Sequence, residues 1–484
     1  MTAESHHDSS RSTKISGTQT NDLLALSATE AISQLKSQRI TSEELVTAAL
    51  DRSEKLGHLN LFTTLEPEQA LSAAREIDRR RTAGEEMGPL AGLPLIIKDN
   101  IDSASLPTTA GSKAFEGWQP KEDAPVLASL LKAGGVMLGK ANMHEMAFGI
   151  TSNNPVYGPV RNPYDTTMIP GGSSGGTAAA IAARVVTGGL GTDTGGSCRI
   201  PAALCGCVGL RPTYGRYSSA GVIPLTWTRD TPGPLARTVE DLILLDSVCA
   251  KRPAEVPKLS LSGVRVAIPS SLYDDLDSEL AQVVERALME LRRVGMVMVD
   301  VDVAGLHRPG ADFRGYEGPR ALSSYLFEHG SRMSVIDLVG KVADSAVRER
   351  LTSQLETGPS DVGVFIESLV VDRPAHLAAI ADYFKDNNLC AMIIPTTALP
   401  ARPIGNDDMV ELNGRQVPTF STYTRNTAFG SGVGLPCLSV PAGLTTSGLP
   451  VGMEFVGPSE GDGVVFALGR EFEKIVGPLP PPSI

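Results

Sequence analysis

The sequence predicts an α/β protein whose central mixed, largely parallel β-sheet is covered by helices on both faces. Short apolar runs typical of strands alternate along the chain with amphipathic helix patterns. For example, a helix pattern from Asp123 to Ala133, with Asp123 as its cap, is followed by a glycine turn and the strand-like run Val136–Gly139. Such an alternation requires crossover connections, which join parallel strands. The chain of 484 residues is long for one core. We nevertheless expect a single domain over 21–484, because large α/β enzymes often remain single.

The N-terminal part is expected to begin with a tail and three helices. Residues 1–20 are polar and lack the basic start and apolar core of a signal peptide, so we expect a disordered leader. Two capping-box patterns predict the helices Ala28–Ser37 and Glu43–Ser53. A third helix is expected from Pro67 to about Arg81, and turn-forming residues then lead into a buried strand, Leu93–Lys98.

The C-terminal half contains the rest of the sheet and one long helical stretch. The helix Ser278–Val294 is flanked by the strand-like runs Val266–Pro269 and Val297–Val303. Residues from about 304 to 388 are mostly helical in pattern and more polar, and we expect them to form a helical cap. Three further buried strands are expected at Leu389–Pro395, Cys437–Val440 and Pro450–Phe455.

Composition excludes several classes of protein. A formal net charge of −12 argues against a nucleic-acid partner, because phosphate binding needs clustered Lys and Arg. No apolar run is long enough to cross a bilayer, so we expect no membrane partner and a cytoplasmic location. Six cysteines in a chain of this length do not form a disulfide framework. The oligomeric state is left open, with a homodimer as one option.

A Gly/Ser-rich run, Ile169–Thr213, contains two turns that each carry a serine. The first turn, Gly-Gly-Ser173-Ser-Gly-Gly, leads into a helix pattern of small residues, Thr177–Val186. The second turn, Thr-Gly-Gly-Ser197, follows a strand-like stretch, Leu190–Asp193. Glycines let the backbone approach a ligand closely, and a hydroxyl beside exposed N–H groups is the arrangement that acyl transfer requires.

Two plainer interpretations of this run fit it less well. A flexible linker would not carry a helix and a strand between its glycines. A phosphate-binding loop would end in Gly-Lys-Ser or Gly-Lys-Thr, and the run contains neither.

The run resembles the signature of the amidase signature family, serine hydrolases that cleave amides with a Ser–Ser–Lys triad. The family also has a lysine at the end of a buried strand, which is matched here by Lys98 in Leu-Pro-Leu-Ile-Ile-Lys98-Asp-Asn. The resemblance extends from about Ser27 to near the C-terminus. It implies the amidase signature fold, an acyl-enzyme, and a reaction without a cofactor. We also find no spaced set of metal ligands in the sequence.

The resemblance implies a role for each member of the triad. Ser197 is the expected nucleophile, although it could instead cap a helix that starts near Ile200. Ser173 is the expected relay and follows a cis peptide bond in the family. Lys98 is the expected base and must be neutral to accept a proton, so burial has to lower its pKa. The plainer interpretation is a lysine that reaches from the strand end to pair with Asp99.

The neighbours of Ser197 are expected to stabilise and shape its turn. The backbone N–H groups of Thr194, Gly195 and Gly196, together with that of Ser197, are the expected oxyanion donors. Loop support is expected from Ser174, Asp193 and Arg199; we expect Asp193 and Arg199 to pair across the turn.

Two other residues near the motif could in principle do chemistry. Cys198 adjoins the nucleophile, but no histidine lies nearby in the sequence to lower its pKa. Cys205-Gly-Cys207 supplies too few ligands for zinc, so we interpret these thiols as structural. His144 is the histidine near a motif, and a Ser-His-Asp triad built on it is a second option for the base.

Several stretches resemble the arylacetamide branch of the family, which includes indoleacetamide and mandelamide hydrolases. The substrate is therefore expected to be a small aromatic primary amide, hydrolysed to the acid and ammonia. Met143, Phe148 and Trp227 are candidate acyl-pocket residues, with ordinary core packing as the alternative.

Two alternative functions are kept. One is the glutaminase component of glutamyl-tRNA amidotransferase, a branch of the family that has glutamine where this chain has Ile200. The other is a non-catalytic binding subunit on the same fold, which would have no need of Lys98, Ser173 and Ser197 together. Malonamidase-like and peptide-amidase-like specificities also stay open.

Overall fold

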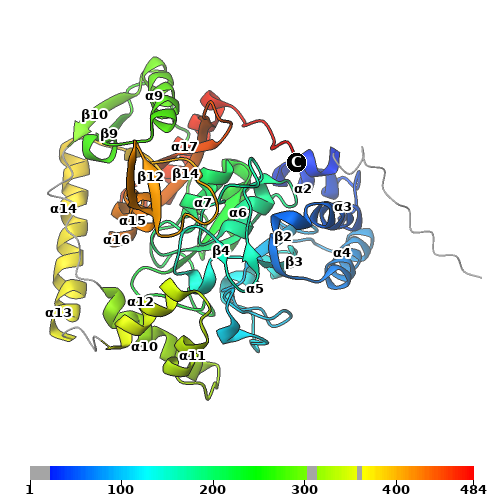
Figure 1. Cartoon of the computed structure of the whole chain (residues 1–484). Coiled ribbons are helices and arrows are strands. Elements are labelled where there is room, and N and C mark those ends of the chain that lie inside the picture. The colour runs from blue at the N-terminus through cyan, green and yellow to red at the C-terminus, as the bar shows by residue number, and fades with distance from the viewer. Residues whose placement is uncertain (1–21, 302–312, 357–361) are drawn as a thin grey trace, which may run out of the picture.

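A mixed sheet runs through the whole molecule. The computed structural model describes residues 22–301, 313–356 and 362–484 (Figure 1). Within these residues the main sheet has eleven strands in the order β1-β3-β2-β6-β8-β7-β14-β15-β11-β9-β10. The strands are β1 (Phe62–Leu65), β2 (Pro94–Lys98), β3 (Val136–Ala141), β6 (Gly188–Asp193), β7 (Val208–Arg211), β8 (Thr231–Ala236), β9 (Arg265–Pro269), β10 (Val297–Val301), β11 (Ala391–Pro395), β14 (Cys437–Leu444) and β15 (Pro450–Val456). Two small hairpins, β4–β5 (Asn153–Asn154 and Gly158–Pro159) and β12–β13 (Met409–Leu412 and Arg415–Pro418), lie outside it.

The sheet is mixed, as expected, but antiparallel pairing outweighs parallel pairing. Parallel pairs join β3 to β2, β2 to β6, β11 to β9 and β9 to β10. The other six pairs, including all those through the centre from β6 to β11, are antiparallel. The expectation of a largely parallel sheet is wrong because β8 was not foreseen. Its sequence, Thr-Pro-Gly-Pro-Leu-Ala, has two prolines that weaken any strand pattern, yet it inserts between β6 and β7.

Helices cover both faces of the sheet, which confirms that part of the expectation. Leu438 and Val440 of β14 lie against Gly469 of α17 (Asp462–Val476). Ser439 points to the opposite face, where it and Gly452 lie against Ala203 of α7 (Arg199–Cys205). The other helices outside the middle segment are α2 (Ala28–Lys36), α3 (Ser42–Lys55), α4 (Pro67–Thr82), α5 (Pro125–Lys132), α6 (Gly175–Ala182), α8 (Val239–Cys249), α9 (Ser278–Arg293), α15 (Thr419–Thr424) and α16 (Ala428–Val433).

The helix ends agree with their local chemistry in most places. Ser27 and Thr41 form the two expected capping boxes at α2 and α3. Asp123, however, is not the cap of α5. That helix starts at Pro125, and the Asp123 carboxylate accepts a hydrogen bond of 2.8 Å from the N–H of Ala104. Helix α6 ends earlier than expected, because Arg184 takes a left-handed conformation with φ of 57°.

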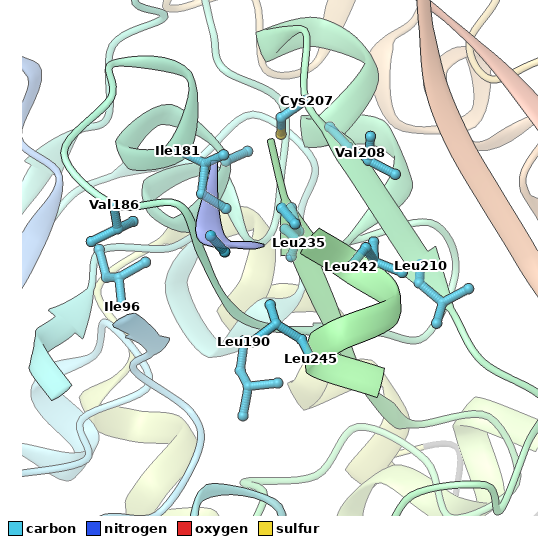
Figure 2. Close-up of a cluster of buried hydrophobic side chains, with 14 of the residues drawn as sticks. Ile96, Ile181, Val186, Leu190, Cys207, Val208, Leu210, Leu235, Leu242 and Leu245 are labelled. Carbon is cyan, nitrogen blue, oxygen red and sulfur yellow. The ribbon is translucent and has the colours of Figure 1, made fainter. Parts of the chain in front are cut away.

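The main core fills the space between the sheet and helices α6 and α8. Figure 2 shows Ile181 of α6 and Leu242 of α8 gathered around Leu190 and Leu235, which come from the adjacent strands β6 and β8. All four side chains are fully buried. This core lies directly behind the strand that ends at the two serine turns, so it fixes where those turns begin.

The middle of the chain forms a separate group of helices beside the sheet (Figure 1). They are α10 (Phe313–Glu328), α11 (Val335–Lys341), α12 (Ser345–Glu356), α13 (Val362–Glu367), a π-helical turn (Ser368–Asp372) and α14 (Arg373–Asp386). The described residues of the expected cap, 304–388, are thus mainly helical. The expected leader and the last two residues of the expected strand Val297–Val303 lie outside the described residues. None of the helices in the described ranges is both long and apolar enough to cross a membrane.

Polar contacts attach this helical group to the body at two places. At the first, Asp102 accepts hydrogen bonds from the Tyr325 hydroxyl (2.7 Å) and binds Nε2 of His329 (2.8 Å), while Trp118 Nε1 donates to Tyr325 (3.1 Å). At the second, the Glu145 carboxylate accepts from the N–H groups of Ala343 and Asp344 (3.0 and 2.6 Å). An apolar cluster that includes Phe115, Leu322 and Leu338 fills the space around these contacts.

Candidate active site

Lys98 ends strand β2 and lies where the carboxyl ends of two parallel strands meet. Its neighbour β6 runs parallel to β2 and brings Thr192 alongside. The Lys98 Nζ lies 2.8 Å from Ser173 Oγ and 2.7 Å from Thr192 Oγ1, and the side chain is fully buried. Burial lowers the pKa of Lys98 to about 8, although nearby acidic groups oppose the shift. A lysine in this state is neutral in a useful fraction near pH 7 and can accept a proton.

The alternative pairing of Lys98 with Asp99 is not what the structure contains. Successive residues of a strand point to opposite sides, and Asp99 faces Lys140, with Oδ1 3.5 Å from its Nζ. The other oxygen of Asp99 accepts hydrogen bonds from Thr109 and from the N–H of Gly111. Lys98 is therefore directed toward Ser173 rather than toward a carboxylate partner.

The two serine turns lie against each other. The peptide bond between Gly172 and Ser173 is cis, as the resemblance implied. The N–H of Ser174 donates to the carbonyl of Ser197 (3.2 Å), which ties the first turn to the second. The hydroxyl of Ser174 also accepts from the N–H of Thr192 (3.3 Å), so Ser174 links both turns to the end of β6.

Ser197 lies at the surface of a pocket and does not cap the helix that follows. Helix α7 begins at Arg199, with Cys198 in the cap position and no side-chain cap hydrogen bond. Ser197 is one of the residues that line the pocket. The helix-cap interpretation of Ser197 is therefore excluded by its position.

The expected oxyanion donors differ in how they are used. The N–H of Gly196 donates to Asp193 Oδ1 at 3.0 Å, so it is already engaged. Across residues 22–301, 313–356 and 362–484, nothing accepts a hydrogen bond from the N–H groups of Thr194, Gly195 and Ser197. These three residues also line the pocket.

Asp193 holds the turn through two arginines. Arg199 donates to it from Nε and Nη2, each bond 3.0 Å long, as the expected pairing across the turn requires. Arg211 donates to the Asp193 backbone carbonyl (2.7 Å) and to its carboxylate (3.1 Å). Burial opposes ionisation, but the two guanidinium groups hold the pKa of Asp193 well below its usual range. The carboxylate is thus a fixed anion behind the turn.

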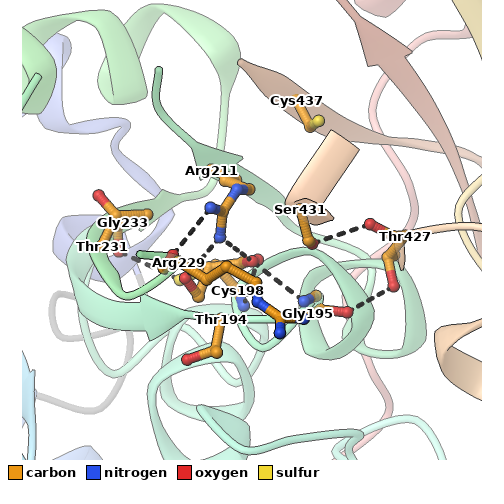
Figure 3. A network of polar contacts seen from close by, with 12 residues as sticks. Thr194, Gly195, Cys198, Arg211, Arg229, Thr231, Gly233, Thr427, Ser431 and Cys437 are labelled. Carbon is orange, nitrogen blue, oxygen red and sulfur yellow. Dashed lines mark hydrogen bonds and ion pairs between the residues drawn. The ribbon is translucent and has the colours of Figure 1, made fainter. Parts of the chain in front are cut away.

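The same buried network reaches the C-terminal part of the chain (Figure 3). Arg199 donates to Glu454 (2.7 Å), to the carbonyl of Thr427 (3.1 Å) and to the hydroxyl of Ser431 (2.6 Å). The hydroxyl of Thr427 in turn donates to the carbonyl of Gly195, next to the nucleophile turn (2.7 Å). Sequence reasoning missed these partners. The available signal was Glu454, a single acid within the apolar strand Pro450–Val456.

A pocket of about 600 Å³, partly open to solvent, lies in front of Ser197. Its walls come from four parts of the chain: the segment after β3, the serine turn, the loop before β8, and helices α12 and α15. The lining residues are Ala147, Phe148, Gly149, Ile150, Thr194, Gly195, Ser197, Leu225, Thr226, Arg229, Arg350, Gln354, Phe420 and Thr424.

Of the three expected pocket residues, only Phe148 lines this space. Met143 is fully buried, and its carbonyl accepts a hydrogen bond from Asn154 (2.8 Å). Trp227 is 42% exposed, and its carbonyl accepts from the Tyr214 hydroxyl. The structure does not bring Met143 or Trp227 to the pocket. The contributions of Arg350 and Phe420 carried no local signal, because those residues lie far from the motifs in the sequence.

The two other candidate groups are directed away from this chemistry. The His144 ring contacts Thr151 (Nδ1, 3.3 Å) and Asp344 (Nε2, 3.7 Å), and burial lowers its pKa. The Cys198 thiol is buried against the carbonyl of Gly233 (3.5 Å), and burial raises its pKa, so it stays protonated. All six cysteines are free thiols in the structure.

Comparisons with known proteins agree with this geometry. The family model described as amidase matches residues 44–466. An indoleacetamide hydrolase of Agrobacterium tumefaciens is 39% identical over 456 residues, 93% of this chain and 97% of that protein. A mandelamide hydrolase of Pseudomonas putida is 36% identical over 488 residues, covering 96% and 94%. A crystal structure of an amidase superposes with a TM-score of 0.82 at 31% identity, covering 93% of this chain and all of the other.

The glutaminase branch is also among the relatives, at lower identity. The corresponding component of the glutamyl-tRNA(Gln) amidotransferase of Chlorobium phaeobacteroides is 33% identical over 478 residues, 91% of this chain and 97% of that protein.

Proposed function

The chain belongs to the amidase family, and from this premise we propose that it hydrolyses a small aromatic primary amide to a carboxylic acid and ammonia. Indoleacetamide and mandelamide, named in two of the relatives, are both primary amides that carry an aromatic ring. The observation that carries the proposal is the buried contact of 2.8 Å between Lys98 Nζ and Ser173 Oγ, beside a pocket that Ser197 lines.

In the acylation step, the hydroxyl oxygen of Ser197 attacks the amide carbonyl carbon. Its proton passes to Ser173, whose own proton passes to neutral Lys98. The tetrahedral intermediate then collapses and the C–N bond breaks. The proton returns from Lys98 through Ser173 to the departing nitrogen, so ammonia leaves and an ester to Ser197 remains.

Deacylation repeats these transfers with water in place of the amide. Water attacks the ester carbonyl carbon, its proton moves through Ser173 to Lys98, and the same proton then restores the Ser197 hydroxyl. The acid leaves, and Lys98 is neutral again. The cycle needs no metal and no cofactor, because the chain supplies both the base and the hydrogen-bond donors.

The oxyanion of each intermediate is proposed to bind the N–H groups of Thr194, Gly195 and Ser197. All three lie at the pocket, and none of these N–H groups donates elsewhere in the described residues. The engagement of Gly196 by Asp193 gives it a supporting role: it holds the turn in the shape that aims its neighbours.

The acyl group is proposed to occupy the pocket beyond Ser197. Phe148, Leu225 and Phe420 give that space apolar walls suited to a flat ring. Residues 304–388 are proposed to act as a cap, since Arg350 and Gln354 of α12 complete the wall of the pocket.

A panel of amides assayed for ammonia release tests the proposal. Arylacetamides such as indole-3-acetamide and mandelamide are expected to give the highest kcat/KM. Release of ammonia from glutamine alone would favour the glutaminase function. Absence of turnover with every amide, together with saturable binding of one, would favour a non-catalytic binding protein.

A further inference from the structure

The described lining of the acyl pocket carries positive charge and no carboxylate. Among these lining residues, Arg229 and Arg350 are the charged ones. An unpaired cation brought into a pocket with this lining meets like charge, and a confined site screens that repulsion less than bulk water does.

Arg350 is fixed to the pocket wall by two aromatic residues that also line it. Its Nη1 donates to the carbonyl of Phe148 (3.1 Å). Its guanidinium carbon lies 4.8 Å from the centre of the Phe420 ring, within the range of a cation–π contact. The charge therefore stays at the wall.

Arg229 is held through its backbone. Its carbonyl accepts a hydrogen bond of 2.8 Å from Arg211, the arginine that also binds Asp193 behind the nucleophile turn. The second positive charge of the pocket is thus tied to the network that fixes Ser197.

The nearest acid to the loop wall, Asp230, faces away from the pocket. Its carboxylate accepts from the N–H groups of Leu225 (2.6 Å) and Thr226 (2.9 Å) and from the hydroxyl of Thr194 (2.7 Å). Asp230 is not among the lining residues. It therefore offers no oxygen to a ligand cation in the pocket.

Glu317 of α10 is the other buried acid on this side, and it too lies behind the lining. Its Oε2 accepts from the hydroxyl of Thr228 at 2.9 Å. Burial raises the pKa of Glu317 to about 7, so near neutral pH a large share of it is uncharged. Asp344 lies next to His144, also outside the lining.

We infer that this pocket selects its amide by charge: it rejects an acyl group that carries an ammonium and accepts a neutral or anionic one. The inference rests on the proposed function and narrows its substrate class. Amino-acid amides and peptide amides with a nearby free amino terminus would be poor substrates. Neutral arylacetamides, and those with a carboxylate on the ring, would be good ones.

The test is a matched series of para-substituted phenylacetamides that differ in charge and little in size. The ring substituents are ethyl (neutral), aminomethyl (cationic) and carboxyl (anionic). We expect kcat/KM of the aminomethyl compound to be at least tenfold below that of the ethyl compound, mainly through KM. The carboxyl compound should equal or exceed the ethyl compound. Raising the salt concentration should narrow the gap between cation and neutral compound.

Variants assign the effect to Arg350. In Arg350→Gln the gap between cationic and neutral compounds should shrink at least threefold. In the control Arg348→Gln it should stay, because Arg348 lies on the same helix but donates to the carbonyl of Val342 (2.8 Å) and does not line the pocket.

The results separate this inference from the proposed function. Equal or faster turnover of the aminomethyl compound by the unaltered enzyme would overturn the charge selection, as would an unchanged gap in Arg350→Gln. Failure to release ammonia from the neutral compound and from every other arylacetamide would instead contradict the proposed function.

Discussion

The turn that carries Ser197 and the helical group of residues 313–356 are attached to the same sheet by different kinds of contact. Behind the turn, Asp193, Arg199 and Glu454 are fully buried and satisfy one another's charge. The helical group is held by an apolar cluster and by polar contacts that include His329, whose side chain is 21% exposed. The difference indicates where each property resides. The bond-making groups sit on the fixed part, and a wall of the pocket sits on the part whose attachment solvent can reach.

The largest effect is expected at the fixed turn itself. Ser197→Ala should lower turnover by roughly 10⁴-fold or more, because the nucleophile is removed, while the fold is kept. Mass spectrometry of quenched enzyme should find an acyl adduct on the peptide with Ser197 in the unaltered protein and none in the variant. An adduct on Cys198 would contradict the assignment.

The next largest effect concerns the base beneath the turn. A lysine whose pKa is about 8 is mostly protonated at pH 7, and only the neutral form accepts a proton. We therefore expect kcat/KM to rise with pH up to about 8 and then level off. Lys98→Ala should remove this limb and lower kcat by about 10³-fold or more, with a smaller change in KM.

His144→Ala provides the comparison for that profile. The rise with pH should persist in this variant, since the His144 ring contacts Thr151 and Asp344 rather than either serine. A limb near the ordinary histidine pKa of about 6.5 that disappears in His144→Ala would show that Lys98 is not the base.

The buried network is expected to dominate stability. Arg199→Met leaves Glu454 without its cation and Asp193 with Arg211 alone, so the free energy of unfolding should fall by about 3–5 kcal/mol. Urea denaturation measures the loss. Arg293→Met, at an exposed pair with Glu290, is the control and should leave the unfolding midpoint unchanged. A similar midpoint for both variants would remove the contrast between the two regions.

The smallest effect is expected at the attachment of the helical group. His329→Ala loses one contact to Asp102, which keeps its hydrogen bond from Tyr325, so unfolding should change by only about 1 kcal/mol. Hydrogen exchange should nevertheless become faster in α10 and stay the same in β6. Phe327→Ala, whose side chain is 84% exposed on the same helix, should leave both unchanged. Equal acceleration in α10 and β6 would mean that the two regions open together.

The sequence predicted what local patterns encode. Capping boxes located α2 and α3, and the spacing of Lys98, Ser173 and Ser197 located groups that the fold places at one strand edge and one pocket. Strand β8 escaped because two prolines obscure its pattern. Tertiary pairing with β6 overrides that local preference, and the share of parallel pairing was misjudged as a result.

The pocket was predicted poorly for a different reason. Arg350 and Phe420 meet Phe148 only after segments about 200 residues apart pack together, and no periodicity or spacing records that meeting. Trp227 was chosen for its chemistry, but the backbone around it places the ring toward solvent.

The attachment of the helical group also gives the protein an optical signal of its own. The chain has two tryptophans, and Trp118 lies 6.0 Å from the ring of His329 and 5.7 Å from that of Phe115, measured between ring centres. Its indole is half-buried, whereas Trp227 is 42% exposed. Departure of α10 from Asp102 would expose Trp118 and shift its emission to longer wavelength, while Trp227 would change little. Tryptophan fluorescence thus reports, without any label, whether the wall that carries Arg350 is in place.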